Sequence, residues 1–185
     1  MDAYVEAAER FDFDREKFRE LVVYVSRQCE DDPTFGAVKL NKILYYADFA
    51  AFRSLHRPIT GASYQKLREG PAPREFLEIR RELIDSGDVS VEYREYFTGR
   101  QHRLVVDRAR QADLRWFSED ELDLVDTIIG FFRGKTAREV SDFSHREPGW
   151  MLANDGEAIP YETAWLSADP IDQETEEAIR EMGIN

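Results

Sequence analysis

One stretch of the chain, from about Gly36 to Arg53, restricts the possible folds more than any other. Its apolar residues fall on nearly every side of a helix: Val38, Leu40, Ile43, Leu44, Tyr45, Tyr46, Ala47, Phe49, Ala50 and Phe52. A surface helix shows a single apolar stripe, whereas a helix that is apolar all round is buried. We therefore expect this helix at the centre of the fold. Lys39, Lys42 and Arg53 predict one narrow polar stripe that faces outwards.

Two helices are predicted on either side of a segment rich in turn residues. Apolar residues at helical spacing predict a helix over 14–29, and a second helix over 74–86 ends at Gly87, a residue typical of helix C-termini. Between the central helix and the second of these, glycines and prolines recur through 54–73. We interpret 54–73 as a series of turns.

Capping residues predict the helices of the second half of the chain. A capping box pairs a Ser or Thr that caps the helix with a Glu three residues later, and two such boxes occur. The boxes are Ser118 with Glu121, and Thr136 with Glu139. They predict one helix that ends near Gly134 and a shorter one that ends near Ser144. Residues 148–185 are expected to form short helices, with Pro160 and Asp172 at helix starts.

Two segments of alternating polarity predict the β-structure. Residues 89–97 and 101–106 form an antiparallel hairpin in this interpretation, with Val89, Val91 and Tyr93 on one face of the first strand. Because an isolated two-stranded ribbon is marginally stable in water, the hairpin must pack on the helices. The predicted fold class is α+β, a mainly α-helical single domain over residues 1–185 with one antiparallel β-hairpin.

Composition restricts the class of protein. A chain of 185 residues with 42% hydrophobic residues fits one domain with a proper core. The single cysteine, Cys29, excludes an internal disulfide framework, and no apolar run approaches the length of a membrane span. With no secretory signal at the acidic N-terminus, we expect a cytoplasmic protein with no membrane partner. The net charge of −13 disfavours a nucleic acid partner, because an acidic surface repels phosphate.

Residue patterns typical of catalysis are absent. The three histidines, His56, His102 and His145, have no metal-binding spacing, and Cys29 lies on an apolar helix face as an inert thiol would. Ser141 and Ser144 lie close to His145 in sequence, but neighbours on a short helix usually diverge rather than converge as a triad requires. There is no phosphate-binding glycine loop. We therefore predict no enzyme, no metal and no cofactor.

Some residues have two interpretations that the sequence leaves open. His145 and Trp150 can fasten a loop to the core or contribute to binding. Gly70 and Pro71 are suited to a turn before a helix, and the structural interpretation is preferred for both pairs. The acidic residues of 147–185 either serve solubility or meet a basic partner.

Five residues are candidates for partner binding. Lys39 and Lys42 are cations on an otherwise apolar helix, so they need a solvent-facing or a paired setting, and they can mark a groove that receives carboxylates. Arg94, Tyr96 and Arg100 fall on the exposed face and the turn of the hairpin, and Tyr and Arg are enriched at interface hot spots.

Three blocks of sequence together resemble a known family. They are KLNKILYYAD from Lys39 to Asp48, Tyr64 with Lys66 and Gly70-Pro71-Ala72-Pro73, and TAREVSDFSHREPGW from Thr136 to Trp150. In this order they resemble the Panacea, or SocA-like, domain, with the resemblance strongest over 36–152. On this resemblance Tyr64, Gly70, Pro71, His145 and Trp150 are family-motif residues, to which we assign a structural role.

The resemblance implies a function. Panacea domains are mainly antitoxins of bacterial and phage toxin–antitoxin systems, so the chain is expected to bind and neutralise a toxin protein encoded by the adjacent gene. An acidic surface then suits a basic, nucleic-acid-binding toxin. Two alternatives are an adaptor that delivers a partner to a protease, which the resemblance also permits, and an unrecognised hydrolase that uses His145. No basic recognition helix is present, so binding to DNA is not expected.

Overall fold

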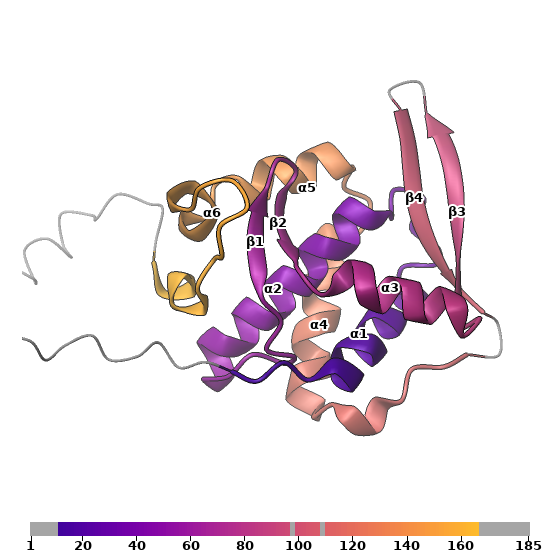
Figure 1. The fold of residues 1–185 in the computed structure, drawn as a ribbon, viewed down its shortest axis with the longest axis horizontal. Helices are drawn as coiled ribbons and strands as arrows, with labels where there is room; N and C mark the ends of the chain where they lie inside the picture. Colours follow the sequence, from indigo (N-terminus) through magenta and orange to yellow (C-terminus); the bar gives the residue numbers. More distant parts are fainter. Residues whose placement is uncertain (1–10, 97–98, 108–109, 167–185) are drawn as a thin grey trace, which may run out of the picture.

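The long helix α2 (Ala37–Leu55) lies at the centre of the molecule, as the sequence predicts. The computed structural model describes residues 11–96, 99–107 and 110–166, with the backbone alone at 94–96 and 99–102. Around α2 pack the helices α1 (Arg15–Gln28), α4 (Glu119–Phe132) and α5 (Ala137–Ser144), as well as the strand β2 (Gly70–Pro73) (Figure 1). This arrangement explains why α2 is apolar on several sides.

The helix starts are fixed by the capping residues that the sequence indicates. The Asp14 side chain accepts a hydrogen bond from the Lys17 backbone N–H at 2.9 Å and caps α1. Both predicted capping boxes are confirmed: Ser118 and Glu121 open α4, and Thr136 and Glu139 open α5. In each box the two side chains satisfy backbone N–H groups that the helix leaves without partners.

A β-hairpin stands where only turns were predicted. Strands β1 (Tyr64–Leu67) and β2 are antiparallel, with Tyr64 opposite Pro73 and Leu67 opposite Gly70. On its other side β1 exchanges backbone hydrogen bonds with residues 156–159. The two prolines of β2 are tolerated because β2 is the edge strand, where a missing N–H costs no ladder bond. The interpretation of 54–73 as turns alone is therefore wrong.

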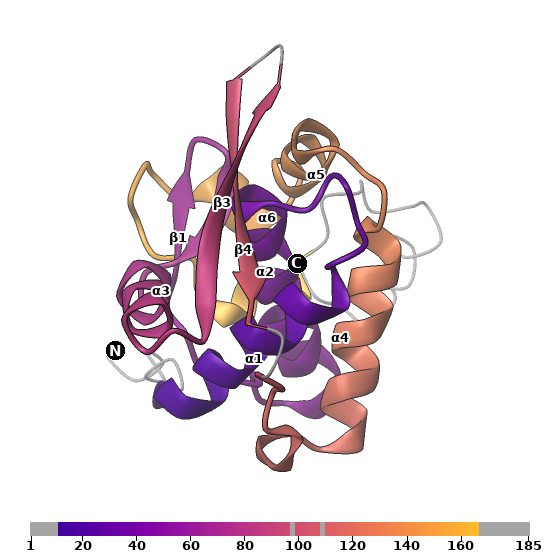
Figure 2. The ribbon, with the colours of Figure 1, turned by 90° about the vertical axis from the view of Figure 1, so that its right-hand side faces the viewer.

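The predicted hairpin is confirmed, but half of it extends away from the core. Strands β3 (Val89–Tyr96) and β4 (Gly99–Val106) follow α3 (Phe76–Asp85) in the sequence and pair with each other antiparallel. Figures 1 and 2 show the ribbon projecting beyond the helices. Val89 is buried at the base of the hairpin, whereas Tyr93, further along the same strand, is 61% exposed. The hairpin therefore packs on the helices at its base only, because none of the described helices covers its outer part.

A buried arginine joins this hairpin to α1. The Arg103 guanidinium on β4 donates hydrogen bonds to the backbone carbonyls of Cys29 (3.1 Å), Glu30 and Asp32 (3.2 Å). These are orphan carbonyl groups at and just beyond the C-terminus of α1, where a cation is also favoured by the helix dipole. This contact is not predictable from local sequence patterns, because the partners are more than seventy residues apart.

Short helices complete the described chain. The 3-10 helix η1 (Leu114–Trp116) precedes α4, and α6 (Pro148–Leu152) and the 3-10 helix η2 (Tyr161–Trp165) follow α5. Pro160 stands directly before η2, while the helix start predicted at Asp172 lies outside the described residues. All the α-helices except α6, together with both hairpins, contribute buried residues to one hydrophobic core. The mainly helical α+β class is confirmed, with a second hairpin added.

Candidate partner-binding groove

The two lysines predicted to face outwards are buried inside the fold. Lys39 and Lys42 are each 1% exposed. Lys39 Nζ donates to Asp32 Oδ2 at 2.7 Å and to Thr34 Oγ1 at 2.6 Å, forming a buried ion pair at the start of α2. The predicted outward polar stripe is therefore wrong for both lysines, because α2 is covered on the side that carries them. Of the three basic residues, Arg53 alone is exposed.

Lys42 connects α2 to the β1–β2 hairpin. Its Nζ donates to the Pro71 carbonyl at 3.0 Å, and burial lowers the pKa of the ammonium to about 7 from its ordinary value of 10.5. Gly70 lies against the same side chain with φ at +101°, a conformation that other residues rarely adopt. A Cβ at position 70 would overlap Lys42 Cε and Ser144 Oγ. Lys42, Gly70 and Ser144 therefore form a close-packed junction of α2, β2 and α5.

The stability of the wild type relative to Lys42→Met is expected to rise with pH. Between about pH 7 and 10.5, the unfolded chain holds a proton on Lys42 that the folded protein does not. Stability from this group is therefore fully present above pH 10.5 and is lost as pH falls through 7. Methionine does not titrate, so the difference in free energy of unfolding between the two proteins should increasingly favour the wild type as the pH rises. Urea unfolding at pH 7, 8.5 and 10 measures this difference. A difference that stays constant with pH would contradict the burial of a titrating amine.

Gly70→Ala is expected to lower the free energy of unfolding by about 2 kcal/mol or more, through backbone strain and overlap at the junction. Gly87→Ala provides a matched control, because Gly87 also has positive φ but has no atom near the position of an added Cβ. Urea unfolding of both variants measures strain alone at position 87 and strain plus overlap at position 70. Equal losses in the two variants would show that the junction is loosely packed.

Tyr64 and Asp48 form a second buried junction between α2 and β1. The Tyr64 hydroxyl lies 2.8 Å from both the Leu44 carbonyl and Asp48 Oδ2. Asp48 also accepts from the Thr60 backbone N–H at 2.7 Å and from the Thr60 hydroxyl at 2.5 Å. Burial raises the pKa of Asp48 to about 6, against the effect of these hydrogen bonds, which favour the charged form. Such a fully buried, multiply bonded carboxylate fixes the path of the chain after α2.

His145 and Trp150 lie together beside β1. Their rings stack with centroids 4.1 Å apart, and Trp150 Nε1 donates to the Leu67 carbonyl at 3.0 Å. Lys66 Nζ lies 4.2 Å from the centre of the Trp150 ring, a cation–π contact, and donates to the Ala153 carbonyl. These contacts fasten the segment between α5 and α6 to the β1–β2 hairpin.

The other partner-binding candidates lie on the projecting ribbon. The backbone of Arg94 and Tyr96 belongs to β3, and that of Arg100 belongs to β4. Their side chains lie outside the described residues, so their role in binding stays a prediction.

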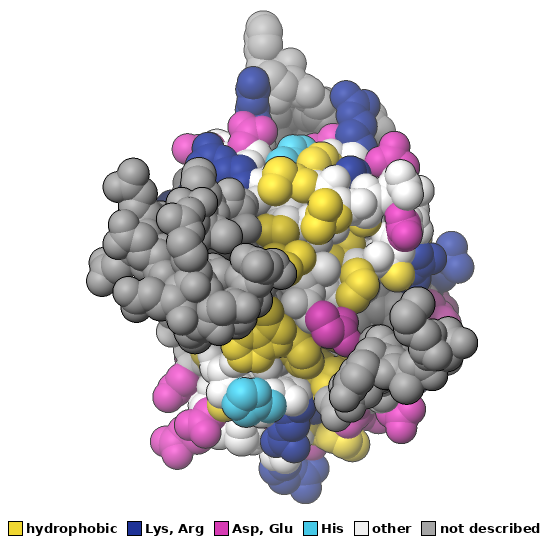
Figure 3. Space-filling model, turned by 90° about the vertical axis from the view of Figure 1, so that its left-hand side faces the viewer, with side chains coloured by type: hydrophobic (Ala, Val, Ile, Leu, Met, Phe, Trp, Pro, Cys, Tyr) yellow, Lys and Arg dark blue, Asp and Glu magenta, His cyan; other side chains and the backbone are white. Residues whose placement is uncertain are grey.

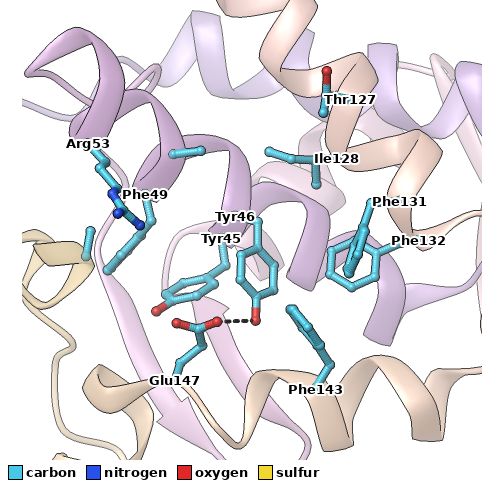
Figure 4. Close-up of a pocket in the computed structure, with 12 residues that line it drawn as sticks. Tyr45, Tyr46, Phe49, Arg53, Thr127, Ile128, Phe131, Phe132, Phe143 and Glu147 are labelled. Carbon is cyan, nitrogen blue, oxygen red and sulfur yellow. Dashed lines mark hydrogen bonds between the residues drawn. The ribbon is translucent and has the colours of Figure 1, made fainter. Parts of the chain in front are cut away.

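A groove in the described surface is lined by none of the residues that the sequence singles out for partner binding. Its volume is about 340 Å³, and we call it the aromatic groove. Figure 4 shows α2 along one side, α4 along another, and the ends of α5 and η2 closing it. Its lining residues are Tyr45, Tyr46, Phe49, Ala50, Arg53, Thr127, Ile128, Phe131, Phe132, Phe143, Glu147 and Ala164.

The walls of the aromatic groove are rings in mutual contact. Phe131 and Phe143 lie 5.1 Å apart, and each contacts Phe132 at the bottom of the wall. Phe132 is 1% exposed, whereas Phe131 is 49% exposed and Phe143 is 37% exposed. The outer rings therefore pack on a core residue while a large part of their surface is open to a partner. Exposed aromatic rings supported in this way are suited to act as binding anchors.

One carboxylate stands among these rings. Glu147, which precedes α6, accepts a hydrogen bond from the Tyr46 hydroxyl at 2.9 Å (Figure 4). Burial raises the pKa of Glu147, and the Tyr46 hydrogen bond opposes that rise. An acid in an apolar setting attracts a cation more strongly than an acid in water, because the lower effective dielectric weakens screening.

An acidic helix face continues from the groove. On α4 the exposed residues Glu119, Asp123, Thr127 and Phe131 follow each other at four-residue spacing and therefore share one face. The first half of this face is acidic, and the second half is the groove wall. Asp123 and Phe131 are separated by about 12 Å along the helix, from the rise of 1.5 Å per residue. The surface thus combines an apolar anchor site with negative charge two turns away.

Hydrophobic side chains also gather on the side of the molecule that carries α6 and η2, which Figure 3 views directly. In these elements and the residue that follows them, four side chains are at least half exposed: Met151, Leu152, Trp165 and Leu166. The described ranges, 11–96, 99–107 and 110–166, contain no group of three or more His, Cys, Asp or Glu residues that could hold a metal ion, and no helix that is long and apolar enough to cross a membrane.

Comparison with known protein families identifies the family of this chain. The family model described as "Antitoxin SocA-like, Panacea domain" matches residues 40–151, which is more than half of the chain. The chain belongs to the SocA-like Panacea family. No match was found among curated proteins or among solved structures. The match covers α2, both hairpins, α4 and α5, so the buried junctions and most of the aromatic groove lie within the Panacea domain.

Proposed function

We propose that this Panacea domain is an antitoxin that neutralises a cognate toxin by binding it directly, and that the aromatic groove is the docking surface. The observation that carries the proposal is the pair of exposed rings, Phe131 and Phe143, held on a buried aromatic base beside Glu147. Apolar side chains of the toxin would fill the groove. Such fixed aromatic anchors supply much of the affinity in protein interfaces.

Charge favours a basic partner. The chain carries a net charge of −13, and the acidic face of α4 leads into the groove. A basic toxin would be steered to this surface, so association should slow as salt rises. Toxins that act on nucleic acid carry basic surfaces, and covering such a surface would block access to the substrate. We propose a non-enzymatic mechanism, with occlusion of the active surface of the toxin and no role for nucleic acid binding by the antitoxin.

The experiment is co-expression with the product of the adjacent gene under separate inducible promoters. The proposal predicts that the neighbour alone stops growth, that this chain restores growth, and that the two proteins co-purify. A harmless neighbour, or a neighbour whose toxicity persists, would contradict the antitoxin function. Growth without co-purification would contradict direct binding.

A protease adaptor is the second candidate, and one observation favours it. An adaptor needs two surfaces, and the projecting β3–β4 ribbon lies on the opposite side of the molecule from α6 and η2 (Figure 1). The two functions differ in what they need from the cell. Neutralisation that fails in strains lacking individual cytosolic proteases, with disappearance of the toxin in the parent strain, would identify an adaptor. Stoichiometric protection that survives in all these strains supports direct inhibition.

A further inference from the structure

In the aromatic groove, the Glu147 carboxylate accepts fewer hydrogen bonds than it can. Glu147 Oε1 accepts from the Tyr46 hydroxyl, while among the described residues Oε2 has no hydrogen-bond or ion-pair partner. A carboxylate can accept up to four hydrogen bonds, and a desolvated one gains most from a charged donor. The position therefore suits an incoming cation better than an apolar or a neutral group.

The aromatic rings around Glu147 indicate which kind of cation would bind there. Six aromatic rings line the groove, from Tyr45, Tyr46, Phe49, Phe131, Phe132 and Phe143. Ring faces attract cations, and a planar guanidinium both stacks on them and offers a fork of N–H donors to a carboxylate. An ammonium is more strongly hydrated and makes only point contacts. Aromatic rings around a carboxylate thus favour arginine over lysine.

Among the described residues, no cationic side chain fills the position. Arg53 lines the groove and is exposed, but it forms no ion pair with Glu147 in the part of the chain that the structure describes. Figure 4 shows its guanidinium beside Phe49, away from the Tyr46–Glu147 hydrogen bond. Lys135 Nζ lies 5.0 Å from the centre of the Phe131 ring, which shows that this wall already accepts a cation–π contact.

We infer that the aromatic groove receives an arginine side chain of the partner protein, with its guanidinium stacked on the rings and hydrogen-bonded to Glu147. The identity of the partner as a toxin rests on the proposed function, but the arginine preference follows from the groove alone. The acidic face of α4 then meets further basic residues of the partner, about two helical turns along α4 from the groove wall at Phe131. The groove would act as a specificity pocket for one residue type within a basic surface.

The test uses two short peptides that differ in one group. Acetyl-Ala-Leu-Arg-Leu-Ala-amide carries the guanidinium, and its citrulline counterpart replaces it with a neutral urea of the same shape. Binding to the full chain is followed by NMR through the methyl groups of Ile128 and Ala164, which line the groove. The arginine peptide should bind about tenfold more tightly, which is the effect of one charge-assisted contact of this kind. Equal affinities, or methyl signals that neither peptide moves, would overturn the inference.

Two variants separate a specific pocket from general attraction. Glu147→Gln keeps an acceptor for the Tyr46 hydroxyl, and it should abolish the preference for arginine over citrulline. Asp123→Asn removes an exposed charge from the acidic face of α4 and should retain that preference. Equal losses in the two variants would assign the effect to net charge and overturn the inference.

The outcome of the peptide experiment is independent of the outcome of the test of the antitoxin function. Neutralisation of the toxin with equal binding of the two peptides would leave the antitoxin function intact and remove the arginine anchor. A retained arginine preference with no neutralisation would support the pocket and contradict the proposed function.

Discussion

Asp48→Ala is expected to lower the free energy of unfolding by about 2–5 kcal/mol, the cost of leaving buried hydrogen-bond donors without an acceptor. The substitution leaves the Thr60 backbone N–H and the Thr60 hydroxyl without their acceptor inside the core, while the Tyr64 hydroxyl retains the Leu44 carbonyl. Each buried donor without a partner costs about 1–3 kcal/mol. The segment that joins α2 to β1 should therefore loosen first. Urea unfolding followed by circular dichroism measures the loss.

Asp142→Ala is the matched control for this prediction. Asp142 lies exposed on α5, and its ion pair with Arg138 is long at 3.8 Å. Removing an exposed carboxylate should change the free energy of unfolding by about 0.5 kcal/mol or less. If Asp48→Ala were as mild as the control, the buried network would not hold α2 to β1 as described.

Phe131→Asp is expected to weaken binding to the toxin by about 30-fold or more, the effect of losing an interface anchor worth at least about 2 kcal/mol. The change removes half of the outer aromatic wall and places a second carboxylate in the groove that Glu147 lines. Co-expression with the toxin should then no longer restore growth. The affinity is measured by titration with the purified toxin, for which an inactive toxin variant is suitable.

Leu152→Asp controls for the introduction of a charge on an exposed apolar residue. Leu152 is 72% exposed on α6 and does not line the aromatic groove. Its substitution should leave toxin affinity within about threefold, since surface changes outside an anchor cost about 0.5 kcal/mol. Both variants should remain folded, because neither side chain belongs to the buried core. Equal loss of affinity in the two variants would contradict docking at the groove.

The helices were predictable because their signals are local. The apolar circumference of α2 requires burial whatever surrounds it, and the capping boxes at Ser118 and Thr136 act within four residues. The projecting hairpin was also predictable, because alternation over eight residues needs no knowledge of the rest of the chain.

The lysines of α2 show where local patterns fail. A cation in an apolar helix is expected to face water, but Lys39 and Lys42 are held by an acid seven residues away and a carbonyl 29 residues away. Tertiary contacts therefore satisfy both charges inside the fold. The β1–β2 hairpin was missed for a similar reason, because its short strands depend on pairing with residues 156–159. Neither the lysine contacts nor the pairing of β1 can be predicted from the residues next to them in the sequence.

The aromatic groove was predictable only in part. Phe131 stands beside the buried stripe of α4 rather than on it, and an aromatic residue off the stripe is a usable sign of an exposed ring. Phe143 and Glu147 gave no comparable signal, because they reach the groove from α5 and from the start of α6. A site assembled from separate elements requires the fold before its members can be recognised.

Direct binding at the aromatic groove is tested by a calorimetric titration of this chain, as wild type and as Phe131→Asp, with the product of the adjacent gene. We expect saturable binding at a fixed stoichiometry for the wild type, and affinity at least about 30-fold lower for the variant. No binding by the wild type would contradict direct neutralisation. Equal binding by the two proteins would contradict the aromatic groove as the docking surface.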